Sequence, residues 1–180
     1  NFYSIYPSNF TKFEDKKFCL VINRSKLNEE INNAVNILET MIGKVDNINL
    51  YDKEILNASC YFSIPLLNIF NKYKFILCFE NSYGNGYITE KIFNCFFAKT
   101  IPIYKGDPNV HKFINPLSFI DGTNITKNIG LIEMLMNDKQ LYNKYIISNK
   151  IANIYNDENY KVELDKFIKN KLETLGKIKK

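Results

Sequence analysis

The sequence predicts an α/β domain built on a mostly parallel, Rossmann-like sheet of about five or six strands, with helices on both faces. Short apolar runs of strand length alternate along the chain with amphipathic segments of helical period, and this alternation is typical of βαβ units. The chain has 180 residues, enough for one compact domain with a core. We therefore expect an entry segment over 1–15 and a single domain over 16–180, with the ligand at the carboxyl ends of the strands.

Apolar patterning places the individual elements. The segment 27–41, for example, carries Leu27, Ile31, Ala34 and Leu38 at helical spacing, which gives one apolar face. The predicted strands are 17–23, 47–51, 74–81, 100–106 and 118–121. The predicted helices are 27–41, 64–73, 87–98, 129–148 and 160–175, with a short helix or turn at 108–114.

Charge and cysteine content narrow the class of protein. The net charge is +5, and lysines gather in the last segment, 166–180. We interpret this tail as a solvated helix end with at most weak contact to an acidic membrane surface, and we expect no nucleic-acid partner. The four cysteines form no C-x-x-C pair and lie mostly in apolar runs, which favours buried, reduced thiols. The single histidine, His111, has no cysteine close by in the sequence, so no metal site is expected.

The segment 79–91, FENSYGNGYITEK, holds the residues best suited to bind a ligand. It joins the most apolar predicted strand to a helix, and Gly84 and Gly86 allow close backbone approach. The start of a helix attracts an anion such as phosphate, and Lys91 adds a full positive charge. Tyr87, Glu90 and Lys91 stand at i, i+3 and i+4, so a helix from residue 87 would present them on one face. A plain tight turn with exposed charges fits the spacing equally well.

A different enzyme class fits the same loop. Residues 84–89 nearly match the dinucleotide fingerprint G-x-G-x-x-G, and Asp107 lies where that fingerprint expects an acid. This pattern would indicate a nicotinamide-dependent oxidoreductase. Thr89 replaces the third glycine, which weakens that alternative.

Residues 74–121 read KFILCFENSYGNGYITEKIFNCFFAKTIPIYKGDPNVHKFINPLSFID. In the order FENS, Y-x-T-E-K, P-I-Y-x-G-x-P and S-F-I, this segment resembles the signature region of the α1,3/4-fucosyltransferases, glycosyltransferase family 10, and the bacterial enzymes above all. The close likeness covers about a quarter of the chain, and a looser one extends over 16–130.

The resemblance implies the C-terminal half of a two-domain GT-B transferase that moves fucose from GDP-fucose to a glycan acceptor with inversion, without a metal or other cofactor for the chemistry. The acceptor site and the catalytic base would belong to an N-terminal domain missing from these residues, so no catalytic residue is assigned. The tyrosine and lysine of the motif would lie against the diphosphate, and the glutamate would serve donor hydroxyls. The implied donor-binding residues are Asn81, Ser82, Gly84, Gly86, Tyr87, Glu90 and Lys91. A bacterial enzyme of this kind would be cytoplasmic or peripheral to the cytoplasmic membrane face, and a eukaryotic one would lie in the Golgi.

One departure from the family weakens the expected donor site. The family places an arginine that contacts the diphosphate shortly after the first strand, and the matching position here is near Glu29. A carboxylate there would repel the diphosphate. Either Arg24 or Lys26 would have to reach the phosphate instead, and the alternative is a non-catalytic nucleotide-binding remnant. We expect His111, Ser118 and Asp121 to be surface or strand-end residues, and Lys105 to be a minor donor contact at most.

Overall fold

The computed structural model describes residues 7, 9–23, 27–49 and 64–152. Its centre is a five-stranded sheet in which all neighbouring strands are parallel. The strands lie in the order β2 (Val45–Asn49), β1 (Lys17–Asn23), β3 (Tyr73–Phe79), β4 (Ile101–Lys105) and β5 (Ile120–Asp121). The predicted parallel sheet is thereby confirmed, since each strand has the expected position within a few residues.

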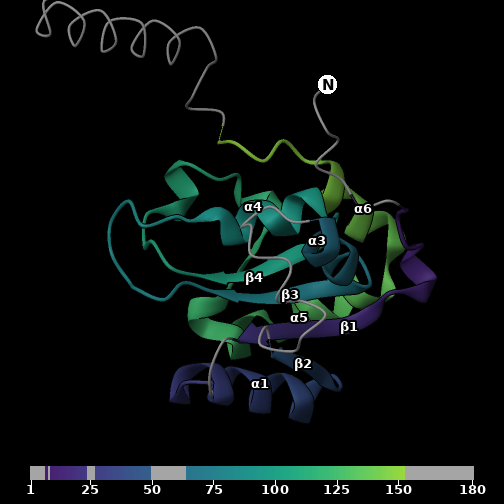
Figure 1. Cartoon of the computed structure of the whole chain (residues 1–180), viewed down its shortest axis with the longest axis horizontal. Coiled ribbons are helices and arrows are strands. Elements are labelled where there is room, and N and C mark those ends of the chain that lie inside the picture. Colours follow the sequence, from purple (N-terminus) through teal and green to yellow (C-terminus); the bar gives the residue numbers. More distant parts are fainter. Residues whose placement is uncertain (1–6, 8, 24–26, 50–63, 153–180) are drawn as a thin grey trace, which may run out of the picture.

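Helices cover both faces of the sheet (Figure 1). Because neighbouring strand residues point to opposite faces, β3 serves two cores: Phe75 and Leu77 face one, and Ile76 and Cys78 face the other. The first core is closed by α1 (Glu29–Met41), α5 (Ile125–Asn137) and α6 (Lys139–Ile147), and the second by α3 (Ile64–Phe70) and α4 (Glu90–Phe97). Every residue of β3 is buried, as expected for the central strand of a two-sided sheet.

Short 3-10 turns complete the described structure. They are η1 (Phe13–Asp15), η2 (Val110–Lys112), η3 (Pro116–Ser118) and η4 (Gly122–Asn124). Asp121 ends β5 and accepts a hydrogen bond from the Thr123 backbone N–H, so its expected role as a strand-end residue is confirmed. No helix among the described residues is both long and apolar enough to cross a bilayer.

The helix expected over 129–148 is wrong in its limits, because two helices occupy this stretch. Asp138 interrupts it: its backbone is extended, and its carboxylate accepts hydrogen bonds from the N–H groups of Gln140 and Leu141. It thereby caps α6 and starts a new helix. Asn124 caps α5 in the same way, which moves the beginning of that helix to Ile125. The helix expected over 160–175 and the basic tail lie outside the described residues.

Three cysteines, Cys19, Cys78 and Cys95, are buried free thiols, as the sequence predicts. Burial raises the pKa of Cys19 to about 12 and also raises that of Cys95, so both remain protonated and pack as small apolar groups. Cys60 lies outside the described residues.

Substitution of Gly122 by alanine is expected to destabilise the domain by about 1–3 kcal/mol, because there is no room for a methyl group. A Cβ at Gly122 would lie 2.8 Å from Cε1 of Phe79 and 3.0 Å from the backbone oxygen of Tyr104. Gly130, inside α5, provides the matched control, since a Cβ there meets no atom within 4 Å. Gly130→Ala should stabilise the helix by about 0.5–1 kcal/mol. Urea unfolding measures both, and equal effects would contradict this packing.

Candidate donor site at the carboxyl ends of the strands

A polar cavity of about 320 Å³ opens at the carboxyl ends of β3 and β4. It is lined by Asn28, Glu30, Phe79, Glu80, Asn81, Ser82, Tyr83, Lys105, Gly106 and Thr123. Strand order reverses between β1 and β3, because β2 lies on one side of β1 and the later strands lie on the other. Such a switch point is where open parallel sheets bind ligands, and the cavity lies there as expected.

The glycine-bearing loop after β3 has a defined conformation. Gly86 has a φ of 79°, which favours glycine over residues with a side chain, and its N–H donates to Oδ2 of Asp107 over 2.9 Å. The second carboxylate oxygen of Asp107 accepts from the N–H of Asn109, and the residue is 2% exposed. Asp107 is therefore a structural acceptor that fixes the loop. Because both carboxylate oxygens already accept hydrogen bonds, Asp107 is a poor partner for a ribose hydroxyl. The nicotinamide-dependent oxidoreductase interpretation therefore lacks the acidic residue that its fingerprint requires.

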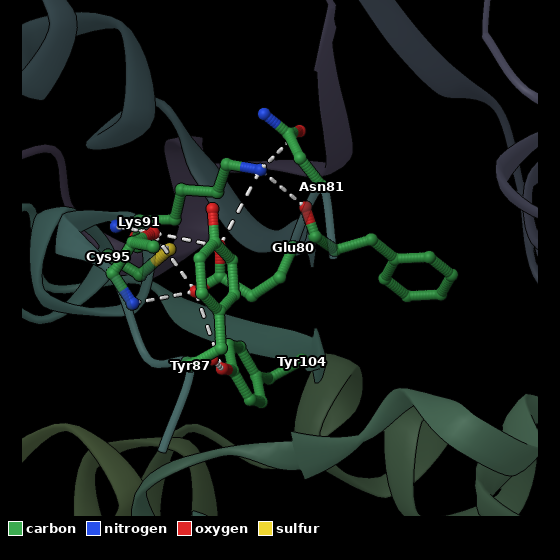
Figure 2. A network of polar contacts seen from close by, with 8 residues as sticks. Glu80, Asn81, Tyr87, Lys91, Cys95 and Tyr104 are labelled. Atoms are coloured by element: carbon green, nitrogen blue, oxygen red, sulfur yellow. Dashed lines mark hydrogen bonds and ion pairs between the residues drawn. The ribbon is translucent and has the colours of Figure 1, made fainter. Parts of the chain in front are cut away.

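Glu80 is the residue around which the site is built (Figure 2). Its side chain is fully buried. One carboxylate oxygen accepts from the backbone N–H of Thr89 at 2.9 Å, and the Thr89 hydroxyl donates to the carboxylate over 2.8 Å. The Tyr104 hydroxyl donates to it from β4 over 3.3 Å. Glu80 thus ties the end of β3 to the start of α4 and to β4.

Lys91 supplies the charge that a buried carboxylate requires. Its Nζ lies 3.7 Å from Oε2 of Glu80, and it donates to the carbonyl of Phe79 over 2.8 Å and to Oδ1 of Asn81 over 2.9 Å. Figure 2 shows the ammonium pointing between Glu80 and Asn81. Lys91 does not itself line the cavity, but its partner Asn81 does. It lies beside the cavity, in contact with this lining residue.

The same buried charge perturbs Tyr104. Burial, and then the negative charge of Glu80, raise the pKa of the Tyr104 hydroxyl well above its ordinary value. The hydroxyl therefore stays protonated across the physiological range and remains a donor to Glu80.

The helix expected from residue 87 begins at Glu90 instead. Thr89 has an extended backbone, and its side chain accepts from the N–H of Lys91, so it is the N-cap. The hydrogen bonds from Thr89 to Glu80 hold it outside the helix. Tyr87 precedes the cap, so the prediction that Tyr87, Glu90 and Lys91 share one helical face is wrong. Glu90 and Lys91 are the first two helical residues.

The other predicted donor residues lie close together along this loop. Asn81 and Ser82 line the cavity. Gly84 accepts a hydrogen bond from the N–H of Tyr87 in a tight turn, and Tyr87 is 40% exposed. Glu90 is half-buried, and its carboxylate makes no hydrogen bond or ion pair within the described part of the chain. Arg24 and Lys26 lie outside the described residues.

Two further charged residues, Lys105 and Glu30, also line the cavity. Lys105, the last residue of β4, forms an ion pair with Glu30 in the first turn of α1. Sequence reasoning gave Lys105 a minor place and missed Glu30, Glu80, Thr89 and Tyr104. The F-E-N motif marked Glu80, but its burial becomes visible only once β3, β4 and α4 are assembled.

The remaining candidates do not line the cavity. His111 is exposed in η2, as expected. Ser118 is buried in η3, so the expectation that it is a surface or strand-end residue is wrong, and its hydroxyl donates to the carbonyl of Asn115. Glu29 is exposed in the first turn of α1. Over the described ranges, no three His, Cys, Asp or Glu side chains gather closely enough to hold a metal ion.

Comparison with known proteins identifies close counterparts of this domain. The family model "Glycosyltransferase family 10 (fucosyltransferase) C-term" matches residues 11–172. The α-(1,3)-fucosyltransferase FucT of Helicobacter pylori is 32% identical over 166 residues, which are 81% of this chain and 33% of that protein. A putative fucosyltransferase, R654, of Acanthamoeba polyphaga mimivirus is 32% identical over 138 residues, which cover 74% of this chain and 22% of that protein.

The fold is also similar to a solved one. The crystal structure of an α1,3-fucosyltransferase with GDP-fucose superimposes with a TM-score of 0.63 and 28% sequence identity, covering 78% of this chain and 41% of that chain. This likeness confirms the predicted Rossmann-like fold. The chain spans about a third of the length of the Helicobacter relative and less of the viral one.

Substitution of Glu80 by alanine is expected to destabilise the domain by about 2–4 kcal/mol, because it leaves buried donors on Thr89 and Tyr104 unpaired and Lys91 without its counter-charge. Glu90→Ala is the matched control ten residues away, and it should cost less than about 1 kcal/mol, since Glu90 contributes only to the helix dipole. Thermal unfolding of both variants measures the difference. A Glu80→Ala protein as stable as Glu90→Ala would show that the buried carboxylate does not organise the site.

Proposed function

The chain belongs to glycosyltransferase family 10, the fucosyltransferases, and we propose that the domain described here binds GDP-fucose as the donor for transfer of fucose to a glycan. The observation that carries the proposal is the polar cavity at the carboxyl ends of β3 and β4, with the glycine-bearing loop and the start of α4 beside it. A diphosphate is the ligand that this combination suits best, because a helix start and a lysine both favour an anion.

In this proposal each predicted residue contacts a different part of the donor. Lys91 and the first turn of α4 face the diphosphate, and Tyr87 lies against it from the loop. Glu90, whose carboxylate has no partner among the described residues, accepts hydrogen bonds from donor hydroxyls. Asn81 and Ser82, which line the cavity, contact the donor, and Gly84 and Gly86 allow the backbone of the loop to approach it.

Similar proteins support the choice of donor. One solved α1,3-fucosyltransferase that this domain resembles holds GDP-fucose, and another holds GDP. The domain covers 41% of each of those chains, so the activity of the whole enzyme is proposed for this protein on the strength of family membership.

We further propose that the donor domain needs an acceptor domain for catalysis. Fucosyl transfer requires a base that removes the proton of the attacking hydroxyl, and an acceptor held in line with the leaving diphosphate. Glu80 is unsuitable as the base, because it is buried and already accepts several hydrogen bonds. Glu90 is engaged by the donor in this proposal. The base is therefore expected on a facing domain, as in a two-domain GT-B enzyme.

Lys91→Ala is expected to weaken GDP binding by about 1.5–3 kcal/mol, the range for hydrogen bonds to charged groups. Added salt should weaken wild-type binding more than binding by the variant. Lys112→Ala, which removes an exposed lysine of η2, is the control and should leave binding unchanged. Calorimetry measures all three proteins, with thermal unfolding to verify that they are folded. If Lys91→Ala binds GDP as wild type does, the phosphate role of Lys91 is wrong.

The 180-residue chain by itself is expected to bind GDP and GDP-fucose but not NAD, and to transfer no fucose to N-acetyllactosamine-type acceptors. Calorimetry with the three nucleotides tests the first part, and preference for NAD would reject the proposed function. Product analysis after incubation with GDP-fucose and acceptor tests the second part. Sustained turnover would place the catalytic base within these residues.

A further inference from the structure

Lys105 and Glu30 both line the cavity and contact one another, although they are 75 residues apart in the sequence. Lys105 ends β4, and its side chain is 23% exposed, whereas that of Glu30 is 52% exposed. The backbone around Lys105 is fixed on both sides. The N–H of Glu80 donates to its carbonyl over 2.8 Å, and a Cβ on the following Gly106 would lie 2.5 Å from Cγ of Glu80. The ammonium is therefore carried on a rigid strand end.

The two lysines of the site differ in their surroundings. The Nζ of Lys91 donates to the carbonyl of Phe79 and to Oδ1 of Asn81, and it lies 3.7 Å from the Glu80 carboxylate as an ion pair. An ammonium has three N–H donors, and Phe79 and Asn81 take two of them in hydrogen bonds, so Lys91 has one N–H left for a ligand. Lys105 makes its ion pair with Glu30, and it is the cationic side chain among the described residues that line the cavity.

The cavity wall also carries two carboxylates, Glu30 and Glu80. The charge of Glu80 is compensated by Lys91 and by the hydroxyl and N–H groups of Thr89 and Tyr104. The charge of Glu30 is compensated by Lys105. An anion that enters the cavity would therefore meet Glu30 as an uncompensated repulsive charge once Lys105 turned toward the ligand.

We propose that Lys105 is a second diphosphate-binding residue, and that Glu30 competes with the donor for its ammonium. In the empty site Lys105 pairs with Glu30, and on binding its Nζ exchanges that carboxylate for an oxygen of the diphosphate. Glu30 thereby lowers donor affinity without touching the donor. This inference rests on the proposed function, because it takes the nucleoside diphosphate as the ligand of the cavity.

The exchange is physically reasonable because the existing ion pair is weak. Pairs whose side chains remain partly in water contribute little to stability. A diphosphate carries more negative charge than one carboxylate. Inside the cavity, water and salt would also screen its attraction to Lys105 less than they screen the pair with the more exposed Glu30. Glu30 also lies in the first turn of α1, where the helix dipole keeps its charge favourable after Lys105 has left.

Isothermal titration calorimetry of the 180-residue chain with GDP tests the proposal. Lys105→Ala should weaken GDP binding by about tenfold, the lower end of the effect of a charged hydrogen bond. Glu30→Gln, which keeps the shape of the side chain, should strengthen GDP binding about two- to fivefold, because it frees Lys105. Lys105→Arg should retain most of the affinity. Lys44→Ala is the control, since that lysine is 85% exposed and precedes β2 at the opposite edge of the sheet.

The opposite effects expected of Lys105→Ala and Glu30→Gln distinguish a role in diphosphate binding from a purely structural role of this ion pair. A mutation that merely loosened the site would weaken binding at both positions. Weaker binding by Glu30→Gln, or a Lys105→Ala protein that binds GDP like Lys44→Ala, would overturn the role of Lys105 while leaving the proposed function intact. A wild-type chain that does not bind GDP at all would overturn the proposed function and this inference together.

Discussion

The buried carboxylate of Glu80 is the interaction on which the rest of the site depends. A charge without access to water is costly unless it is paired and hydrogen-bonded. Glu80 satisfies that requirement with groups from two elements: Thr89 and Lys91 at the start of α4, and Tyr104 on β4. Each partner is consequently held at a fixed place relative to the end of β3. The start of α4 and the end of β4 are therefore held against the end of β3 by one charge.

The sequence suggests one lysine for the diphosphate site, Lys91, whereas the structure shows two lysines with different surroundings, Lys91 and Lys105. Lys91 compensates the buried Glu80 and supports Asn81, so part of its positive charge is used within the protein. Lys105 faces the cavity from the neighbouring strand with a weaker partner. In our account the first lysine organises the diphosphate site and the second responds to the ligand. Asp107 has a similar structural task, because it holds the loop through the N–H of Gly86.

Much of the fold could be predicted from the sequence because its signals are local. Apolar runs and helical periodicity gave the sheet and the helices, and the run around Phe75 correctly predicted the most buried strand. The errors lie where a polar side chain decides the backbone. Asp138 breaks one expected helix into two, and Thr89 delays the start of α4. Both residues act as caps, and a cap inside a continuous amphipathic pattern is easily missed.

The candidate site was less predictable than the fold. The motif around Asn81 and Lys91 marked a loop that borders the cavity, since its residues are adjacent in sequence. The pair of Lys105 and Glu30 joins residues 75 positions apart, so it exists only once β4 lies beside β3 and α1 covers the sheet. Asp107 fitted a dinucleotide fingerprint by spacing alone, but in the structure its carboxylate accepts hydrogen bonds from the N–H groups of Gly86 and Asn109.

We propose that the donor diphosphate binds at the carboxyl ends of β3 and β4. Titration of the ¹⁵N-labelled chain with GDP, followed by backbone amide chemical shifts, locates the bound nucleotide. The largest shifts are expected in the loop 81–86, at the first turn of α4 and at Lys105 and Gly106, and these shifts should saturate together. Shifts confined to the amino-terminal edge of the sheet, or to α5 and α6, would contradict this proposal.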